Sequence, residues 1–353
     1  VAAGPAEPTL ESRYEVDYGK RVTSAFGYRF PARRLAGGES VDLLFVHPEF
    51  AGREESEAHL KRLEAASRSG ELPAGLLRVH GHSWFGEDLV VGSDPRETAS
   101  LADHLMAREG GVLPPEEALG LLVPVAEALD FLEKRRLPGS SLGLNDILVS
   151  RLAEAPAPGR GGEAAAGAGA GGRCLAQIDP LLVPPAGMRR EASAEGGGDG
   201  THTITATTAL WGGVAGLDQP NAVALAGLLY RLVVGLELPE AARISVSAFT
   251  PTQKLGDQSN AFLREVIAGQ CSPMPSCARL LERLYENEDM RLPERIELLR
   301  EAPPPFPKLP HTAGGGTTAT ERPRSSVATH SGTVGTQATA TAPMRSAVVT
   351  ATH

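Results

Sequence analysis

Apolar and polar residues in the first part of the chain alternate at the short spacing that is typical of strands. Two such runs, Arg29 to Phe30 and Val41 to Val46, flank a turn at Gly37 and Gly38, which predicts a hairpin. Apolar residues recur at helical spacing over residues 55–68, and two more strand-like runs follow at 76–81 and 88–92. The pattern therefore predicts a small sheet with one helix.

The second part of the chain has a helical pattern. Apolar positions recur every three or four residues from Glu116 to Arg135, and Pro114 and Pro115 stand just ahead as a helix start signal. The same spacing predicts further helices at 221–234, 258–269 and 276–286. Strands followed by helices indicate the α+β class, with a β-rich part at about 14–95 and a helical part at about 96–300.

Several segments lack the large apolar residues that a core requires. Residues 301–353 are mostly Pro, Thr, Ala, Gly and Ser, and they bury too little surface to offset the entropy of an ordered chain. We expect this segment to be a disordered tail. By the same reasoning, residues 1–13 form a flexible N-terminus, and residues 153–173 and 187–203 form flexible insertions.

Charge and composition exclude several classes of protein. A formal net charge of -9 argues against nucleic-acid binding, which normally needs a basic surface. The most apolar run, Leu225 to Leu238, is too short to span a bilayer and contains Arg231. The three cysteines lack the spacing of metal ligands and are odd in number, which predicts reduced thiols. The sequence shows no secretory signal, so we expect a cytoplasmic protein without a membrane segment.

Four phrases, in order along the chain, resemble the bacterial Ser/Thr protein kinase family. VDLLFVHPEFAG (41–52) is similar to that family's third strand, and LDFLEKRRLPGSSLGLNDILV (129–149) to its catalytic loop. NAVALAGLLYRLVVGLELP (221–239) resembles a large helix of the family, and PSCARLLERL (275–284) its closing helix. The resemblance implies a bilobal protein-kinase-like fold with a small β-rich N-lobe and a larger helical C-lobe.

Phosphoryl transfer by such a fold requires a glycine-rich loop, a strand lysine, a base and metal-binding groups. The lysine position corresponds to Leu44, which has no charge, and the glutamate that would pair with it corresponds to Glu64, for which we expect a solvated position. Of the three loop glycines only Gly27 remains. It is either a weak nucleotide-binding residue or a turn residue.

The catalytic loop has lost its reactive groups. Ser141 stands where the resemblance places the aspartate base, and Gly143 where it places a lysine. A hydroxyl cannot accept a proton at neutral pH, and general-base assistance is worth about 10²- to 10⁴-fold in rate. No residue of this chain is therefore assigned a catalytic role.

Two carboxylates remain at metal-binding positions. Asp179 corresponds to the metal-binding aspartate, and Asp146 replaces a metal-binding asparagine. Carboxylate oxygens are ligands for Mg²⁺, so these two residues are the candidate metal site. The alternative is that Asp179 bonds to a local turn while Asp146 faces solvent.

The resemblance and its losses lead to the interpretation of a pseudokinase, which acts as a signalling or scaffold module by binding other proteins, such as an active kinase, and needs no cofactor. The alternative is a divergent kinase with residual ATP and Mg²⁺ binding, in which Lys20 or Arg29 replaces the lost lysine. A third interpretation is an interaction domain whose ligand is the kinase domain of another protein.

Overall fold

The computed structural model describes residues 9–96, 99–137, 142–151, 174–182, 220–235, 249–294, 296 and 306–308. The chain divides into a compact unit, residues 1–311, and a second unit, residues 312–353, of which no residue is described. The predicted insertions at 153–173 and 187–203 lie outside the described residues.

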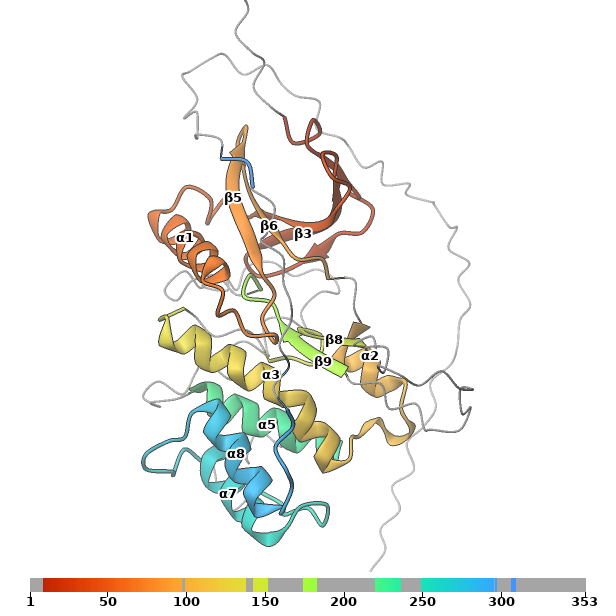
Figure 1. Ribbon diagram of the computed structural model, residues 1–353, viewed down its shortest axis with the longest axis vertical. Coiled ribbons are helices and arrows are strands. Elements are labelled where there is room, and N and C mark those ends of the chain that lie inside the picture. Colours follow the sequence, from red (N-terminus) through yellow and green to blue (C-terminus); the bar gives the residue numbers. More distant parts are fainter. Residues whose placement is uncertain are drawn as a thin grey trace, which may run out of the picture. The chain divides into compact units, whose positions relative to one another are not determined.

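The N-terminal half is an antiparallel sheet in the order β1-β3-β4-β6-β5, with β2 paired to β3 (Figure 1). Its strands are β1 (Tyr14–Val16), β2 (Val22–Thr23), β3 (Gly27–Arg34), β4 (Ser40–Val46), β5 (Val79–Phe85) and β6 (Asp88–Ser93). The predicted hairpin is β3 and β4, joined through Gly38, whose positive φ of 76° suits glycine. The strand expected at 76–81 begins later, at Val79, because residues 74–77 pair with the other half of the chain.

The predicted helices are all present. They are α1 (Glu54–Arg68), α3 (Pro115–Lys134), α5 (Pro220–Val234), α7 (Asp257–Ile267) and α8 (Cys277–Asn287). Helix α3 begins at Pro115, one residue before the predicted start at Glu116, and the missing N–H of a proline costs no hydrogen bond at this position. The short helix α2 (Leu101–Met106) and a second sheet in the order β7-β8-β9 were not predicted; its strands are β7 (Ala99–Ser100), β8 (Ile147–Arg151) and β9 (Cys174–Ile178).

Strand β4 separates two apolar cores. Leu44 and Val46 belong to the main core, which continues into the helical half through residues such as Leu129 and Leu225. Val41 and Leu43 point to the other face and pack in a smaller core with Tyr14, Val90 and Phe306. Successive residues of a strand point to opposite faces, so one face of the sheet is directed toward the helical half and the other away from it. We call these the cleft face and the outer face.

Backbone hydrogen bonds join the two halves beside the cleft face. The N–H of Leu77 donates to the carbonyl of Ile178 (3.0 Å), and the N–H of Ile178 donates to the carbonyl of Gly75 (2.8 Å). The side-chain amide of Gln177 donates to the carbonyl of Ala74 (2.9 Å). This junction holds the end of β9, and with it the next residue, Asp179, against the sheet.

Other sequence expectations have mixed outcomes. All three cysteines are free, as expected: Cys277 is buried, and Cys174 and Cys271 are partly buried. Among the described residues, no helix has the length and apolarity needed to cross a membrane. Most of the expected tail lies outside the described residues, but Phe306 to Lys308 are described, and Phe306 is buried against the sheet.

Candidate functional site

The cleft face carries a buried arginine directly opposite the position where a lysine was expected. Arg29 on β3 pairs in register with Leu44 on β4, so the two side chains lie on the same face of the sheet. The Arg29 side chain is only 2% exposed. Arg29 is therefore a fully buried cation at the side of the sheet that meets the helical half.

The guanidinium of Arg29 is bound by groups from three elements. Its Nη2 lies 2.5 Å from Oδ2 of Asp179, which follows β9. Its Nη1 donates to Oγ of Ser93 at the end of β6 (2.9 Å) and to Oδ2 of Asp42 on β4 (3.5 Å). Arg29 thus links strands β4 and β6 of its own sheet to the segment that the helical half contributes.

A second arginine completes this network. The Nε of Arg96 lies 3.9 Å from Oδ2 of Asp179, and the backbone N–H of Arg96 donates to Oδ2 of Asp42 (3.2 Å). Two guanidinium groups therefore face the carboxylates of Asp42 and Asp179. Charges that are removed from water need partners of this kind, because a single unpaired charge in the interior is very costly. We call Arg29, Asp42, Ser93, Arg96 and Asp179 the ion network.

Burial and charge pairing shift the pKa values of the ion network in opposite directions. Burial raises the pKa of Asp42, although the neighbouring Arg29 guanidinium opposes this effect. Burial lowers the pKa of Arg96, while the Asp179 carboxylate opposes that effect. In both cases the effect of burial on the pKa is larger than the opposing attraction of the partner.

Asp179 is bound at both carboxylate oxygens. Its Oδ1 accepts a hydrogen bond from the backbone N–H of Leu181 (2.9 Å), which fixes the turn after β9, and its Oδ2 contacts the two arginines. Its side chain is fully buried. Bonding to a local turn was the alternative to metal binding, and the structure shows such a bond.

Asp146 lies at the same end of the second sheet. Ile147 pairs with Ile178 in the β8–β9 register, so Asp146 and Asp179 occupy the next pair of positions along these strands. The backbone N–H of Asp146 donates to the carbonyl of Gly143 in the turn before β8 (2.9 Å). Ser141, the expected base position, lies outside the described residues. Within the described ranges, no group of three or more His, Cys, Asp or Glu side chains could hold a metal ion.

Leu44 and Lys20 take no part in the ion network. Leu44 is fully buried in the main core, on a strand, as the sequence predicted. Lys20, the other cation considered as a replacement for the missing lysine, has a side chain that is 75% exposed and pairs with Asp17 (3.4 Å). Of the two cations considered, only Arg29 lies at the site.

Gly27 has a structural requirement for glycine. A Cβ at this position would overlap the backbone carbonyl oxygen of Phe45 on β4, so β3 and β4 can approach one another only with glycine here. The hairpin turn before it is closed by Ser24, whose backbone N–H donates to the carbonyl of Gly27 (2.9 Å) and whose Oγ donates to the same carbonyl (3.0 Å). The close strand approach explains this glycine without a phosphate.

Glu64 does not have the solvated position that we expected from the sequence. Its side chain is 8% exposed and pairs with Arg68 on the same helix (2.5 Å), with His82 on β5 (3.3 Å) and with Lys308 (3.9 Å). The general tendency of glutamates to be exposed was overridden here, because three basic side chains surround the carboxylate.

Sequence reasoning missed Asp42, Ser93 and Arg96. The signal for Asp42 was present, since VDLLFV places an aspartate in an apolar strand on the same face as Leu44. A carboxylate in that position predicts a buried cation across the strand, and Arg29 is two residues from the position opposite. Ser93 and Arg96, at the end of β6 and just after it, carry no comparable pattern.

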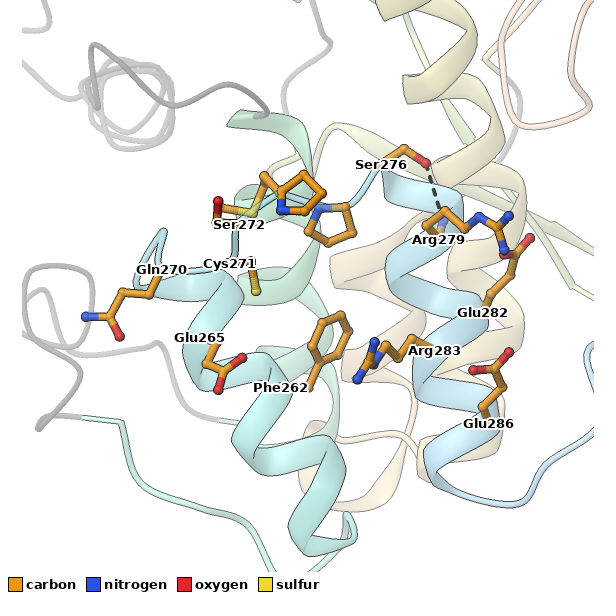
Figure 2. A pocket seen from close by; sticks show the side chains of 13 residues that line it. Phe262, Glu265, Gln270, Cys271, Ser272, Ser276, Arg279, Glu282, Arg283 and Glu286 are labelled. Atoms are coloured by element: carbon orange, nitrogen blue, oxygen red, sulfur yellow. Dashed lines mark hydrogen bonds and ion pairs between the residues drawn. The ribbon is translucent and has the colours of Figure 1, made fainter.

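A separate cavity of about 650 Å³ lies between α7 and α8. Figure 2 shows its wall, where the Arg283 guanidinium lies over the ring of Phe262 at 5.2 Å. Charged side chains of both signs line it, including Glu265, Arg279 and Glu282. None of the residues that the kinase resemblance places at the nucleotide or metal site lines this cavity, so it does not correspond to the nucleotide site that the resemblance implies.

Comparison with known proteins gives one kind of match. No family model and no curated protein matches the chain. Among solved structures, a double-mutant form of the Mycobacterium tuberculosis PknI kinase domain matches at 18% identity with a TM-score of 0.50, covering 78% of this chain and 96% of that chain. Another crystal structure of the same kinase domain matches over the same shares of the two chains at 18% identity with a TM-score of 0.48. The bilobal protein-kinase-like fold of the α+β class, predicted from the sequence, is confirmed.

Proposed function

We propose that this chain is a pseudokinase, a protein-kinase-like domain that is catalytically impaired and acts as a signalling or scaffold module by binding other proteins. The observation that carries the proposal is the Arg29–Asp179 ion pair of 2.5 Å. In this pair, Arg29 of the sheet binds Asp179, the carboxylate that the kinase resemblance assigns to metal.

The ion network does not fit a nucleotide with its metal. Mg²⁺ binds carboxylate oxygens, water and phosphate at short distances in octahedral geometry. At Asp179 the oxygen Oδ2 already lies near two guanidinium groups, which repel a cation. For Mg²⁺ to bind, Arg29 would have to leave Asp179, and its burial offers no solvent to replace that partner.

The remaining chemistry is also absent from the positions where the resemblance places it. Leu44 offers no charge to a phosphate, and Ser141 offers no base. The loss of a general base alone corresponds to about 3 to 5 kcal/mol of activation free energy, at about 1.36 kcal/mol for each factor of ten. A protein that keeps the fold without these groups is suited to binding rather than to phosphoryl transfer.

The test is a thermal unfolding titration with ATP and Mg²⁺, with ADP and with metal alone, beside an active kinase as a positive control. Ligand at a hundred times its dissociation constant stabilises a protein by about 2.7 kcal/mol. We expect no change in the melting temperature of this chain. A metal-dependent rise would contradict the proposal, as would stoichiometric self-phosphorylation, detected by mass spectrometry, that is abolished by Asp146→Ala and by Asp179→Ala.

One observation favours a second candidate, a divergent Ser/Thr protein kinase with residual ATP binding and phosphoryl transfer. Arg29 is a cation on the strand beside Leu44, so its guanidinium is near the place where a phosphate-binding lysine was expected. In this candidate, ATP would displace Asp179 from Arg29, and Asp179 and Asp146 would hold Mg²⁺.

Substitutions at Arg29 test the role that the second candidate gives to this residue. Arg29→Lys keeps a cation at the site but gives up the two-pronged contact of the guanidinium. In a residual kinase, Arg29→Lys would preserve the stabilisation by ATP and Arg29→Met would abolish it. In a pseudokinase neither variant, nor the parent chain, responds to ATP.

A further inference from the structure

The outer face of the sheet holds an aromatic side chain from far along the chain. Phe306 is buried in the smaller core beside Leu43 and Val90. Its ring stacks on Tyr14 of β1, with ring centroids 6.0 Å apart and planes at 30°. In the order of the sequence, Phe306 lies well beyond the last helix, α8.

Two glycines form the floor beneath this ring. Gly81 on β5 and Gly92 on β6 are paired across the strands. A Cβ at Gly81 would lie 2.8 Å from Cβ of Phe306, and a Cβ at Gly92 would overlap the aromatic ring. Glycine in a strand interior weakens the strand and often marks a close approach by another group. Here the group is Phe306, and we call the space above the two glycines the glycine slot.

A polar group lies beside the slot. Nζ of Lys308 is 3.9 Å from Oε1 of Glu64, and Nδ1 of His82 is 3.3 Å from Oε2 of the same carboxylate. Pro307, between Phe306 and Lys308, lines a small cavity with Arg13 and Leu35. The three consecutive residues Phe-Pro-Lys therefore each have a defined neighbour on the N-terminal half.

The same part of the chain also lies beside the helical half. Pro293, Glu294 and Ile296, which follow α8, line a cavity together with Gly120 and Val123 of α3. Figure 1 shows the chain after α8 running along α3, and the blue segment that contains Phe306 beside β5. Described residues that follow α8 thus lie beside the helices first and beside the sheet further on.

We infer that the glycine slot is a binding site for an aromatic side chain, that Phe306 fills it within the same chain, and that the described residues after α8 (288–294, 296 and 306–308) thereby act as a clasp between the sheet and the helices. The occupant is the chain's own Phe-Pro-Lys segment, since the ring, the proline and the lysine all have partners on this surface. The inference is independent of the proposed function, because the slot is on the face opposite the ion network.

The test uses the full chain and a pair of substitutions. Phe306→Ala empties the slot, and Gly92→Ala places a methyl group in it. The backbone at residue 92 does not require glycine, so the added methyl acts mainly on the Phe306 ring. Each variant should lower the melting temperature by roughly 5–10 °C. The double variant should be no less stable than Phe306→Ala alone, because the methyl then has no ring to displace.

Tyr18→Ala is the matched control, since it removes an aromatic ring from the N-terminal half that is 55% exposed. It should change the melting temperature far less than Phe306→Ala does. Additive effects of Gly92→Ala and Phe306→Ala, or a Phe306→Ala variant that melts like the control, would overturn the slot. If Phe306→Ala does not fold, Phe306→Leu should give a smaller fall that follows the same non-additive rule.

Specific binding of the aromatic segment by the slot is tested by adding that segment as a separate peptide. A peptide with the sequence of residues 302–311 (APPPFPKLPH) should raise the melting temperature of the Phe306→Ala chain, and the same peptide with alanine in place of its phenylalanine should not. The peptide should not raise it for the double variant, whose slot already contains the methyl that Gly92→Ala introduces. Equal effects of both peptides would overturn the assignment of a specific site.

The clasp is tested by hydrogen exchange. In Phe306→Ala we expect faster exchange in β5 and β6 and also at the amides of Leu77 and Ile178, which join the two halves. Faster exchange that is confined to β5 and β6 would show that Phe306 only covers the sheet, and it would overturn the clasp.

Discussion

The two faces of one sheet bury different chemistry. In β4, Asp42 and Leu44 point to the cleft face, and Val41 and Leu43 point to the outer face. The cleft face holds the ion network, in which Arg29 contacts Asp179 from the helical half. The outer face holds the glycine slot with Phe306. Both faces are covered by groups that lie far away in the sequence.

The difference teaches what each kind of contact contributes. The attraction within a buried ion pair roughly offsets the cost of removing both charges from water, so the pair adds little net stability. Removal of one partner is strongly destabilising, because the other charge stays buried and unpaired. An aromatic ring in an apolar slot stabilises the fold in proportion to the area it buries. We therefore expect the cleft face to fix the relative position of the two halves, and the outer face to supply free energy.

The largest effect is expected when the ion network loses one member. Arg29→Met leaves Asp42 and Asp179 buried with only the more distant guanidinium of Arg96, which should destabilise the protein by about 3–5 kcal/mol. Denaturant unfolding monitored by circular dichroism measures this value. Arg33→Met on the same strand, where the side chain is exposed, is the control and should change stability by less than about 0.5 kcal/mol.

The same comparison can be sharpened with a compensated variant. Replacing Arg29 and Asp179 together, as Arg29→Met with Asp179→Leu, removes both charges of the closest pair, and this should recover much of the lost stability. If the double variant were as unstable as the sum of the two single variants, the two side chains would not be coupled, and the assignment of a buried ion pair to the cleft face would be wrong.

A smaller effect is expected from a buried histidine on α1. His59 is fully buried with its ring 6.2 Å from that of Phe26, and neither ring nitrogen has a hydrogen-bond partner among the described residues. Burial, with a smaller effect of Arg62, lowers the pKa of His59 from 6.5 to about 4. Unlike the ion network, this group has no compensating charge.

The pH dependence follows from the direction of that shift. Between pH 6.5 and about 4 the unfolded state binds a proton at His59 that the folded state does not, so this contribution to stability is complete above about pH 6.5 and decreases as the pH falls. The loss should approach about 3 kcal/mol near pH 4, at about 1.36 kcal/mol per pH unit. Unfolding curves of the parent chain and of His59→Phe should diverge in this range, and parallel curves would contradict the assignment.

The smallest effect is expected at the edge of the outer face. The Lys308 side chain is 76% exposed and lies 3.9 Å from Glu64, so solvent screens the pair. Lys308→Ala should change the free energy of unfolding by less than about 0.5 kcal/mol. A loss above about 1 kcal/mol in the same denaturant experiment would mean that the outer face also depends on charge, and that the contrast between the two faces is too simple.

The elements that the sequence predicted well are those with a strong local pattern. The apolar repeat of α3 and the Pro114–Pro115 signal predict that helix without reference to the rest of the chain, and the start at Pro115 agrees. The hairpin of β3 and β4 and the strand position of Leu44 follow from alternation in the same way.

The contacts that were missed join residues far apart in the sequence. Asp42 lies in the same hairpin as Arg29, but the other partners come from the end of β6 and from the turn after β9, and no local pattern connects those two with Arg29. Phe306 is a single aromatic residue among prolines, so composition predicted a tail where the structure has a packed ring. In the same way, the surroundings of Glu64 depend on His82 and Lys308, which the helix sequence does not contain.

Gly27 also has a consequence for evolution. It is the last of the loop glycines, yet a side chain there would collide with the backbone of β4. Selection for a closed hairpin is therefore sufficient to retain it, whether or not a nucleotide ever binds. In descendants of this chain we expect Ser24 to change among small polar residues while Gly27 is retained. A search pattern based on glycine spacing alone would then take a glycine that strand packing requires as evidence of nucleotide binding.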